Sequence, residues 1–308
     1  MTALVAVSAH LPETVPVASL QRGLGLSDLG IRRFERLYGL SRICRSDESE
    51  ADLLLAAAGK LEGLAGQEDR VRYVVRARTV PFAAPYPLSP LARVRAELGL
   101  RHATTFTVSE HACASGLLAV DLCGTLLAAD GDPDALALVL LGEKAFTSSV
   151  EMIPDVAVMG EGTAALLVSA GGTRDRLLGY ATRSYGREDA AFVMSEDSAA
   201  EFRRIYNNGL AEVMNTAVAR AGLLPSDVDL VLPHNVNRIS WTRSAKELGL
   251  DPARIFLDNV SETGHCFCAD PFLNLSTACE LGRLRPGDRY LMTSVGLGST
   301  FSAMLFEH

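Results

Sequence analysis

Residues 105–120 decide the fold: they read TFTVSEHACASGLLAV, an apolar strand that runs into one cysteine and is followed at once by an apolar helix. This order places the Cys113 sulfur at a helix N-terminus, where the helix dipole and unpaired N–H groups favour a nucleophilic thiolate. A cysteine before a buried helix is more often a small core residue. The residues at positions 112 and 114–116 are all small. They leave room for a substrate and therefore favour the nucleophile.

Strand-like and helix-like segments alternate along the rest of the chain. The predicted strands cover residues 4–8, 71–77, 104–108, 135–141, 164–169, 177–184, 228–232, 254–257, 290–295 and 300–306. Helices with one apolar stripe are predicted at 49–64 and 195–221. This alternation predicts an α/β fold. A glycine-rich break at 170–175 divides the chain into two predicted halves, residues 1–170 and residues 171–308.

The composition excludes several classes of protein. The 308 residues include 29 Lys+Arg and 37 Asp+Glu, a net charge of -8, without a basic block. Nucleic acid is therefore not an expected partner, because phosphate contacts need concentrated positive charge. No uninterrupted apolar run reaches the roughly 20 residues of a membrane span, and the N-terminus lacks a basic region. We expect no membrane partner and a cytoplasmic location.

The cysteines are predicted to be free thiols. A chain of this size without a secretion signal does not need a disulfide framework. The six are Cys44, Cys113, Cys123, Cys266, Cys268 and Cys279. Cys123 and Cys279 lie within helical patterns and are expected in the core. The Cys-x-Cys pair beside His265 lacks the two paired ligand motifs of a structural zinc site, so no metal is predicted.

Two histidines are candidate catalytic residues that could act together with the nucleophile. His234 follows the predicted strand at 228–232 after one proline, and His265 follows Thr263 and Gly264 just before a predicted helix. Both are expected at the C-terminal edge of a sheet, where α/β proteins bind ligands. Asn235 and Asn237 adjoin His234 and are candidate substrate-binding residues. The remaining histidines are less promising: His10, His102 and His308 are expected in solvent, and His111 faces the site only in a favourable turn.

A glycine turn lies between the last two predicted strands. Residues 294–301 read SVGLGSTF. Such a turn can aim backbone N–H groups at developing negative charge, although a plain tight hairpin is the default interpretation. The backbone N–H groups of Cys113 and Gly298 are the candidate oxyanion hole.

As a set, these features resemble the β-ketoacyl-ACP synthase III branch of the thiolase-fold condensing enzymes. The order of Cys113, His234, His265 and the glycine turn is similar. So are residues 9–16 (AHLPETVP), 85–87 (PYP), 160–165 (GEGTAA) and 282–288 (GRLRPGD). The resemblance implies a five-layer αβαβα fold of two pseudo-equivalent halves. It also implies a homodimer in which Tyr86 lines the partner's acyl pocket, acyl carrier protein or CoA thioesters as substrates, and no cofactor.

Two departures from the family bear on the chemistry. His265 stands where synthases of type III have the Asn of Gly-Asn-Thr, so the implied triad is Cys113, His234 and His265. The Thr-Gly-His sequence is similar to that of elongating ketosynthases. Residues 34–40 (FERLYGL) only partly match the segment in which Trp and Arg hold the CoA adenine. A carrier-protein thioester is therefore at least as well supported as a CoA donor.

Three functions follow from this resemblance. The first is decarboxylative condensation of acyl-Cys113 with a malonyl-type extender, in fatty-acid-like or polyketide metabolism. The second is transfer of the acyl group to an amine or hydroxyl with His234 as base, which the unusual run CFCAD at 266–270 favours. The third is a non-catalytic subunit of a heterodimer. A Cys-His hydrolase would need a carboxylate or Asn to orient its histidine, and Asn235 and Asn237 are the candidates.

Overall fold

One continuous nine-stranded mixed sheet runs through the molecule in this computed structural model, which describes residues 1–81, 88–147, 150–185 and 195–308. A single pair of residues, Ala3 and Arg176, joins its two parts, which are called the first and the second sheet below. The strand order of the first sheet is β5-β4-β6-β9-β1. These strands are β5 (Thr104–Val108), β4 (Val71–Ala77), β6 (Leu136–Leu141), β9 (Thr163–Ser169) and β1 (Ala3–His10). The strand order of the second sheet is β11-β12-β13-β10. These strands are β11 (Leu230–Leu232), β12 (Arg289–Gly296), β13 (Thr300–Glu307) and β10 (Arg176–Ser184).

The two sheets repeat one pairing pattern. In the first, β4 pairs in parallel with β5 and β6, and antiparallel pairings then lead to β9 and β1. In the second, Val231 of β11 forms a parallel bridge with Ile255, β11 pairs in parallel with β12, and antiparallel pairings lead to β13 and β10. The strand predicted at 254–257 is thus reduced to one bridge. In the described part of the chain, β1 and β10 join the two sheets where Ala3 pairs with Arg176, and the predicted boundary at 170/171 falls in the turn between β9 and β10.

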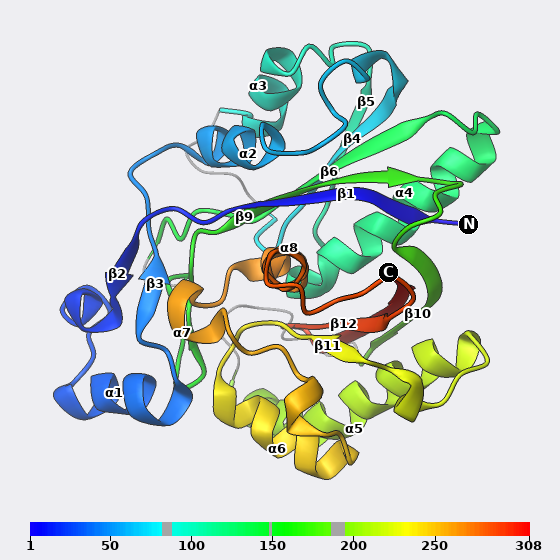
Figure 1. The fold of residues 1–308 in the computed structure, drawn as a ribbon. Coiled ribbons are helices and arrows are strands. Elements are labelled where there is room, and N and C mark those ends of the chain that lie inside the picture. Colours follow the sequence, from blue (N-terminus) through cyan, green and yellow to red (C-terminus); the bar gives the residue numbers. More distant parts are fainter. Residues whose placement is uncertain (82–87, 148–149, 186–194) are drawn as a thin grey trace.

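Helices cover both sheets and fill the space between them (Figure 1). The central layer holds α4 (Ser115–Asp130) and α8 (Asp270–Glu280), whose apolar side chains share one core with both sheets. Helices α2 (Glu50–Ala58) and α3 (Pro90–Glu97) pack on the outer face of the first sheet. Helices α5 (Glu196–Arg220) and α6 (Arg238–Leu248) pack on the outer face of the second. The layers therefore follow the order α, β, α, β, α, as predicted.

A short 3-10 turn precedes each central helix. Ala112–Ala114 leads into α4 and Phe267–Ala269 leads into α8, and the two turns lie against each other. Each opens with a non-glycine residue at positive φ, 45° at Ala112 and 55° at Phe267. The repeat of the two halves thus brings a Cys-bearing turn and a His-bearing segment to one place between the sheets.

Smaller elements complete the chain. They are β2 (Thr14–Pro16), β3 (Arg42–Cys44), β7 (Met152–Ile153), β8 (Ala157–Val158), α1 (Asp28–Arg32), α7 (Val260–Thr263), a π-helix at Arg33–Tyr38, and 3-10 turns at Val17–Leu20, Glu68–Arg70, Pro225–Asp227 and Pro252–Arg254. The helical segment Ala112–Asp130 is long and apolar enough to span a membrane. In the structure, however, its apolar side chains fill the core between the sheets.

Two further local predictions are wrong. The helix predicted at 49–64 ends at Ala58 with Gly59 as its C-cap, and the N–H groups of Lys60 and Leu61 then bond to the carbonyls three residues before them instead of four. His308 is not in solvent: its Nδ1 lies 2.7 Å from Asp175 Oδ1, and its side chain is only 8% exposed.

Candidate active site

Cys113 is held in a tight loop at the end of β5. It is buried (3% exposed) in the turn Ala112–Ala114 that begins α4. Its carbonyl oxygen accepts a hydrogen bond of 2.7 Å from the hydroxyl of Ser294 in β12. The positive φ of Ala112 is a sparsely populated conformation that such tight packing maintains. The predicted nucleophile is therefore fixed by contacts from both halves of the chain.

The glycine turn between β12 and β13 packs directly on this loop. A Cβ atom at Gly296 would lie 2.1 Å from the carbonyl oxygen of His111, so only glycine allows the approach. Gly298 has a φ of 97° in the same turn. The turn therefore lies against the Cys113 loop, and the N–H groups of Cys113 and Gly298 stay the predicted donors of an oxyanion hole.

His265 connects Cys113 to a carboxylate that the sequence analysis did not assign to the site. Its Nε2 lies 3.3 Å from Cys113 Sγ, and its Nδ1 lies 2.5 Å from Oδ2 of Asp270. Asp270 opens α8 and is fully buried. Its two oxygens also accept backbone N–H groups, Oδ1 from Cys266 at 2.7 Å and Oδ2 from Asn235 at 2.5 Å. Cys113, His265 and Asp270 thus form a continuous chain of contacts.

The charges of this chain stabilise one another. Burial lowers the pKa of His265, but the Asp270 carboxylate and the Cys113 thiolate outweigh it and raise that pKa to about 10. The imidazole is therefore protonated at neutral pH while the thiolate is present. An imidazolium beside a thiolate is the arrangement that activates a cysteine nucleophile.

His234 has a different environment. Its Nε2 lies 2.9 Å from the hydroxyl of Tyr206, and its carbonyl oxygen accepts the indole N–H of Trp241 at 2.9 Å. Burial, followed by the charge of His265, lowers the pKa of His234 to about 3. The ring centres of His234 and His265 are 6.3 Å apart. The two predicted histidines are thus neighbours, one charged and one neutral.

Asn235 and Asn237 hold the framework of the site. The side-chain amides of Asn235 and Asn274 bond each other, with N···O distances of 3.2 and 2.9 Å. Asn237 caps α6 by accepting Ser240 N–H at 2.7 Å, and it donates to the Val156 carbonyl at 2.9 Å. Both polar ends of each side chain therefore have protein partners. The sixth candidate side chain, Tyr86, lies outside the described residues.

Asp270 and Tyr206 were both missed because each fits an ordinary structural pattern. Asp270 followed by Pro271 is an ordinary helix start, and Tyr206 falls on the apolar stripe of a long helix. The useful signal was the acid at the end of the unusual run CFCAD, five positions after His265. A carboxylate so close to a candidate base is the orienting group that a Cys-His site would need.

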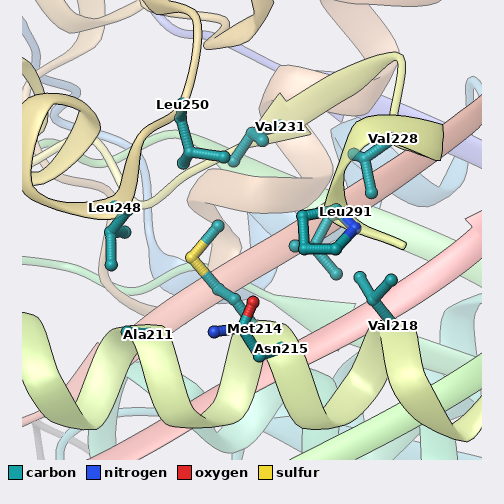
Figure 2. Close-up of a pocket in the computed structure, with 10 residues that line it drawn as sticks. Ala211, Met214, Asn215, Val218, Val228, Val231, Leu248, Leu250 and Leu291 are labelled. Atoms are coloured by element: carbon teal, nitrogen blue, oxygen red, sulfur yellow. The ribbon is translucent and has the colours of Figure 1, made fainter. Parts of the chain in front are cut away.

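Two cavities lie outside this chain of contacts. An apolar cavity of about 40 Å³ lies between α5 and the second sheet, and Figure 2 shows Met214 of α5 beside Leu248 and Leu250 there. A larger cavity of about 480 Å³ adjoins the start of α2 and includes Arg93, Lys144 and Phe146. Within the described ranges, no group of three His, Cys, Asp or Glu side chains is arranged to hold a metal ion.

Comparison with known proteins agrees with this architecture. Residues 218–308 match the family described as 3-oxoacyl-[acyl-carrier-protein (ACP)] synthase III C terminal. The β-ketoacyl-[acyl-carrier-protein] synthase III 2 of Streptomyces coelicolor is 29% identical, covering 82% of this chain and 77% of the relative. The synthase III of Roseobacter denitrificans is 28% identical, covering 98% and 97%.

Solved structures show the same fold. ChlB3, described as an acyltransferase, has a TM-score of 0.85 at 21% identity, covering 99% of this chain and 97% of its own. The 3-oxoacyl-[acyl-carrier-protein] synthase III of Aquifex aeolicus has a TM-score of 0.83 at 20% identity, covering all of both chains. The chain has the thiolase-like fold. The family match of residues 218–308 and the names of the relatives support assignment to the β-ketoacyl-ACP synthase III family.

Proposed function

We propose that this protein is a synthase III-like acyltransferase that loads an acyl group on Cys113 and passes it to a hydroxyl or amine. The acyl donor would be a thioester of acyl carrier protein or CoA. The observation that carries the proposal is the buried chain of contacts from Cys113 through His265 to Asp270. A nucleophile, a base and an orienting carboxylate are the parts that acyl transfer between heteroatoms requires.

In the first half-reaction, the Cys113 thiolate attacks the thioester carbonyl of the donor. The N–H groups of Cys113 and Gly298 would stabilise the oxyanion. As the tetrahedral intermediate collapses, its bond to the donor sulfur breaks, and the His265 imidazolium gives its Nε2 proton to the departing thiolate. Cys113 then carries the acyl group, and His265 is neutral.

In the second half-reaction, the same imidazole acts as the base. Acylation removes the negative charge of Cys113, which is one of the charges that raise the pKa of His265. The neutral Nε2 can therefore take the proton of an acceptor O–H or N–H as that atom attacks the acyl carbon. The bond to the Cys113 sulfur breaks, and Asp270 stabilises the imidazolium that forms again.

Decarboxylative condensation is the second candidate function. The two buried imidazoles, with ring centres 6.3 Å apart, favour it, as do the synthase names of the relatives. In that reaction both histidines would donate N–H groups to the carbonyl oxygen of a malonyl thioester. Tyr206 already occupies Nε2 of His234, so the geometry favours acyl transfer.

Intact-mass analysis of acyl loading tests the proposal. Wild type exposed to acyl-N-acetylcysteamine and acyl-carrier thioesters is expected to gain the mass of one acyl group. Cys113→Ala should gain none, and His265→Ala should load far more slowly. An acylated Cys113→Ala protein would refute the assignment of the nucleophile.

We also propose, as the resemblance implies, that the chain forms a homodimer and works in fatty-acid-like or polyketide metabolism. Exposed Leu88 and Phe146 beside the 480 Å³ cavity support a subunit contact on that face. Light scattering at micromolar concentration should give twice the monomer mass of 32.9 kDa. A monomer would contradict this part of the proposal.

A further inference from the structure

The phenol of Tyr206 is a buried group in contact with His234 for which acyl transfer provides no role. Tyr206 lies on α5 and is held by edge-to-face contacts, with its ring centre 5.6 Å from that of Phe202 and 6.0 Å from that of Phe301. Its hydroxyl is 2.9 Å from Nε2 of His234. The ring is thus fixed by packing, and the hydroxyl is directed at one atom.

This hydrogen bond determines what His234 can do. A neutral imidazole has one N–H, and Nε2 either donates it to the phenol oxygen or accepts the phenol proton. In both cases Nε2 is engaged with Tyr206. His234 therefore cannot present a free Nε2–H to a substrate carbonyl while the phenol stays in place.

Decarboxylation of a malonyl thioester needs such a donor. The bond between the α-carbon and the carboxylate breaks, CO₂ leaves, and the electron pair moves to the thioester oxygen as an enolate. Water then protonates the enolate carbon to give an acetyl thioester, or the enolate attacks the acyl group on Cys113. Hydrogen-bond donors aimed at the enolate oxygen lower this barrier, and one donor contributes on the order of 10²–10³-fold. His265 can supply one donor, and His234 would supply the second.

We propose that Tyr206 is a specificity-determining residue that suppresses malonyl decarboxylation by engaging Nε2 of His234. The inference rests on the proposed acyl transfer and deepens it, since it names the residue that separates transfer from condensation. The inference predicts that removal of the Tyr206 hydroxyl group raises the rate of malonyl decarboxylation. A merely structural tyrosine would not have this effect.

The test is the Tyr206→Phe variant, incubated with malonyl-N-acetylcysteamine while CO₂ release and acetyl-N-acetylcysteamine are measured. Phenylalanine keeps the ring contacts and removes only the hydroxyl. We expect roughly a tenfold or larger rise in decarboxylation over wild type. Adding His234→Ala to the variant should abolish the gain. Tyr185→Phe is the matched control, because Tyr185 also contacts Phe301 but directs its hydroxyl to Glu212 at 2.8 Å.

Several results would overturn the inference. Decarboxylation at the wild-type rate in a folded Tyr206→Phe protein would do so, as would a gain that survives His234→Ala or appears equally in Tyr185→Phe. Tyr206→Leu provides a second hydroxyl-free variant if Tyr206→Phe does not fold, and absence of a gain there has the same meaning. A different result would refute the proposed acyl transfer itself. In that case the wild-type protein would discharge acyl-Cys113 with a malonyl thioester and release CO₂.

Discussion

Replacing Asp270 by asparagine tests the most consequential contact in the site. The carboxylate is buried and accepts three hydrogen bonds, from His265 and from the backbone N–H groups of Cys266 and Asn235. Asparagine has the same shape, but one of its two polar ends is a donor. If that end faces Cys266, a buried N–H loses its acceptor. If it faces His265, Nδ1 must accept the amide N–H. The neutral imidazole then carries its proton on Nε2 and cannot act as a base beside Cys113.

The expected magnitude follows from these losses. Loss of the orienting carboxylate from a nucleophile-His-acid site costs on the order of 10³–10⁴-fold in rate, about 4–5 kcal/mol of transition-state stabilisation. An unsatisfied buried N–H costs about 1–3 kcal/mol of folding free energy. Asp270→Asn should therefore fold with a lower melting temperature and transfer acyl groups far more slowly than wild type.

The assay combines acyl loading by intact mass with alkylation of Cys113 by iodoacetamide between pH 5 and 10. In wild type the raised pKa keeps His265 charged below about pH 10, so the positive charge beside the sulfur is constant from pH 6 to 9 and alkylation should show no step from loss of that charge in this range. Asp270→Asn lowers the pKa of His265, so its alkylation should be slow near pH 6 and rise with pH. Glu262→Gln, an exposed acid in the same segment, is the control. A folded Asp270→Asn protein with loading within threefold of wild type would refute the reasoning.

Three further variants test the framework of the site. Gly296→Ala would place a Cβ 2.1 Å from the His111 carbonyl; we expect a displaced turn, a lower melting temperature and slower acyl loading. Trp241→Phe removes the indole N–H bonded to the His234 carbonyl, and chemical denaturation should show a loss of about 1–3 kcal/mol. Ser294→Ala leaves the carbonyl of the nucleophilic cysteine without its buried donor, so loading should slow although the thiol is intact. Wild-type loading by Gly296→Ala and Ser294→Ala, or wild-type stability of Trp241→Phe, would contradict the geometry.

Most strand positions were predictable because each buried strand is a short apolar run bounded by turn residues, whereas the arrangement in two similar halves followed only from the family resemblance. The strands Val71–Ala77 and Thr104–Val108 match their predicted ranges, and α5 (Glu196–Arg220) lies within one residue of its own. The position of Cys113 at the end of a strand and before a helix also followed from the local pattern. The segment 254–257 could not be resolved in this way, since only tertiary pairing reduces it to one bridge.

The pairing of side chains in the site could not be read from the sequence. His234 and His265 were both expected near Cys113, but only the fold reveals that His265 contacts the sulfur while Tyr206 engages His234. Tyr206 is separated from His234 by 28 residues, and its helical spacing is that of an ordinary core residue. Such a contact depends on how α5 packs against the second sheet, which no local pattern encodes.

The most direct test of the central claim is the fate of the acyl group on Cys113. Wild type is loaded with acyl-N-acetylcysteamine, freed of excess donor, and offered a panel of alcohols and amines or a malonyl-carrier thioester, while acyl mass, products and CO₂ are followed. The account predicts discharge to an alcohol or amine that depends on His265 and Asp270, without CO₂ release. Discharge only by the malonyl thioester, with one CO₂ released per β-ketoacyl product, would contradict it.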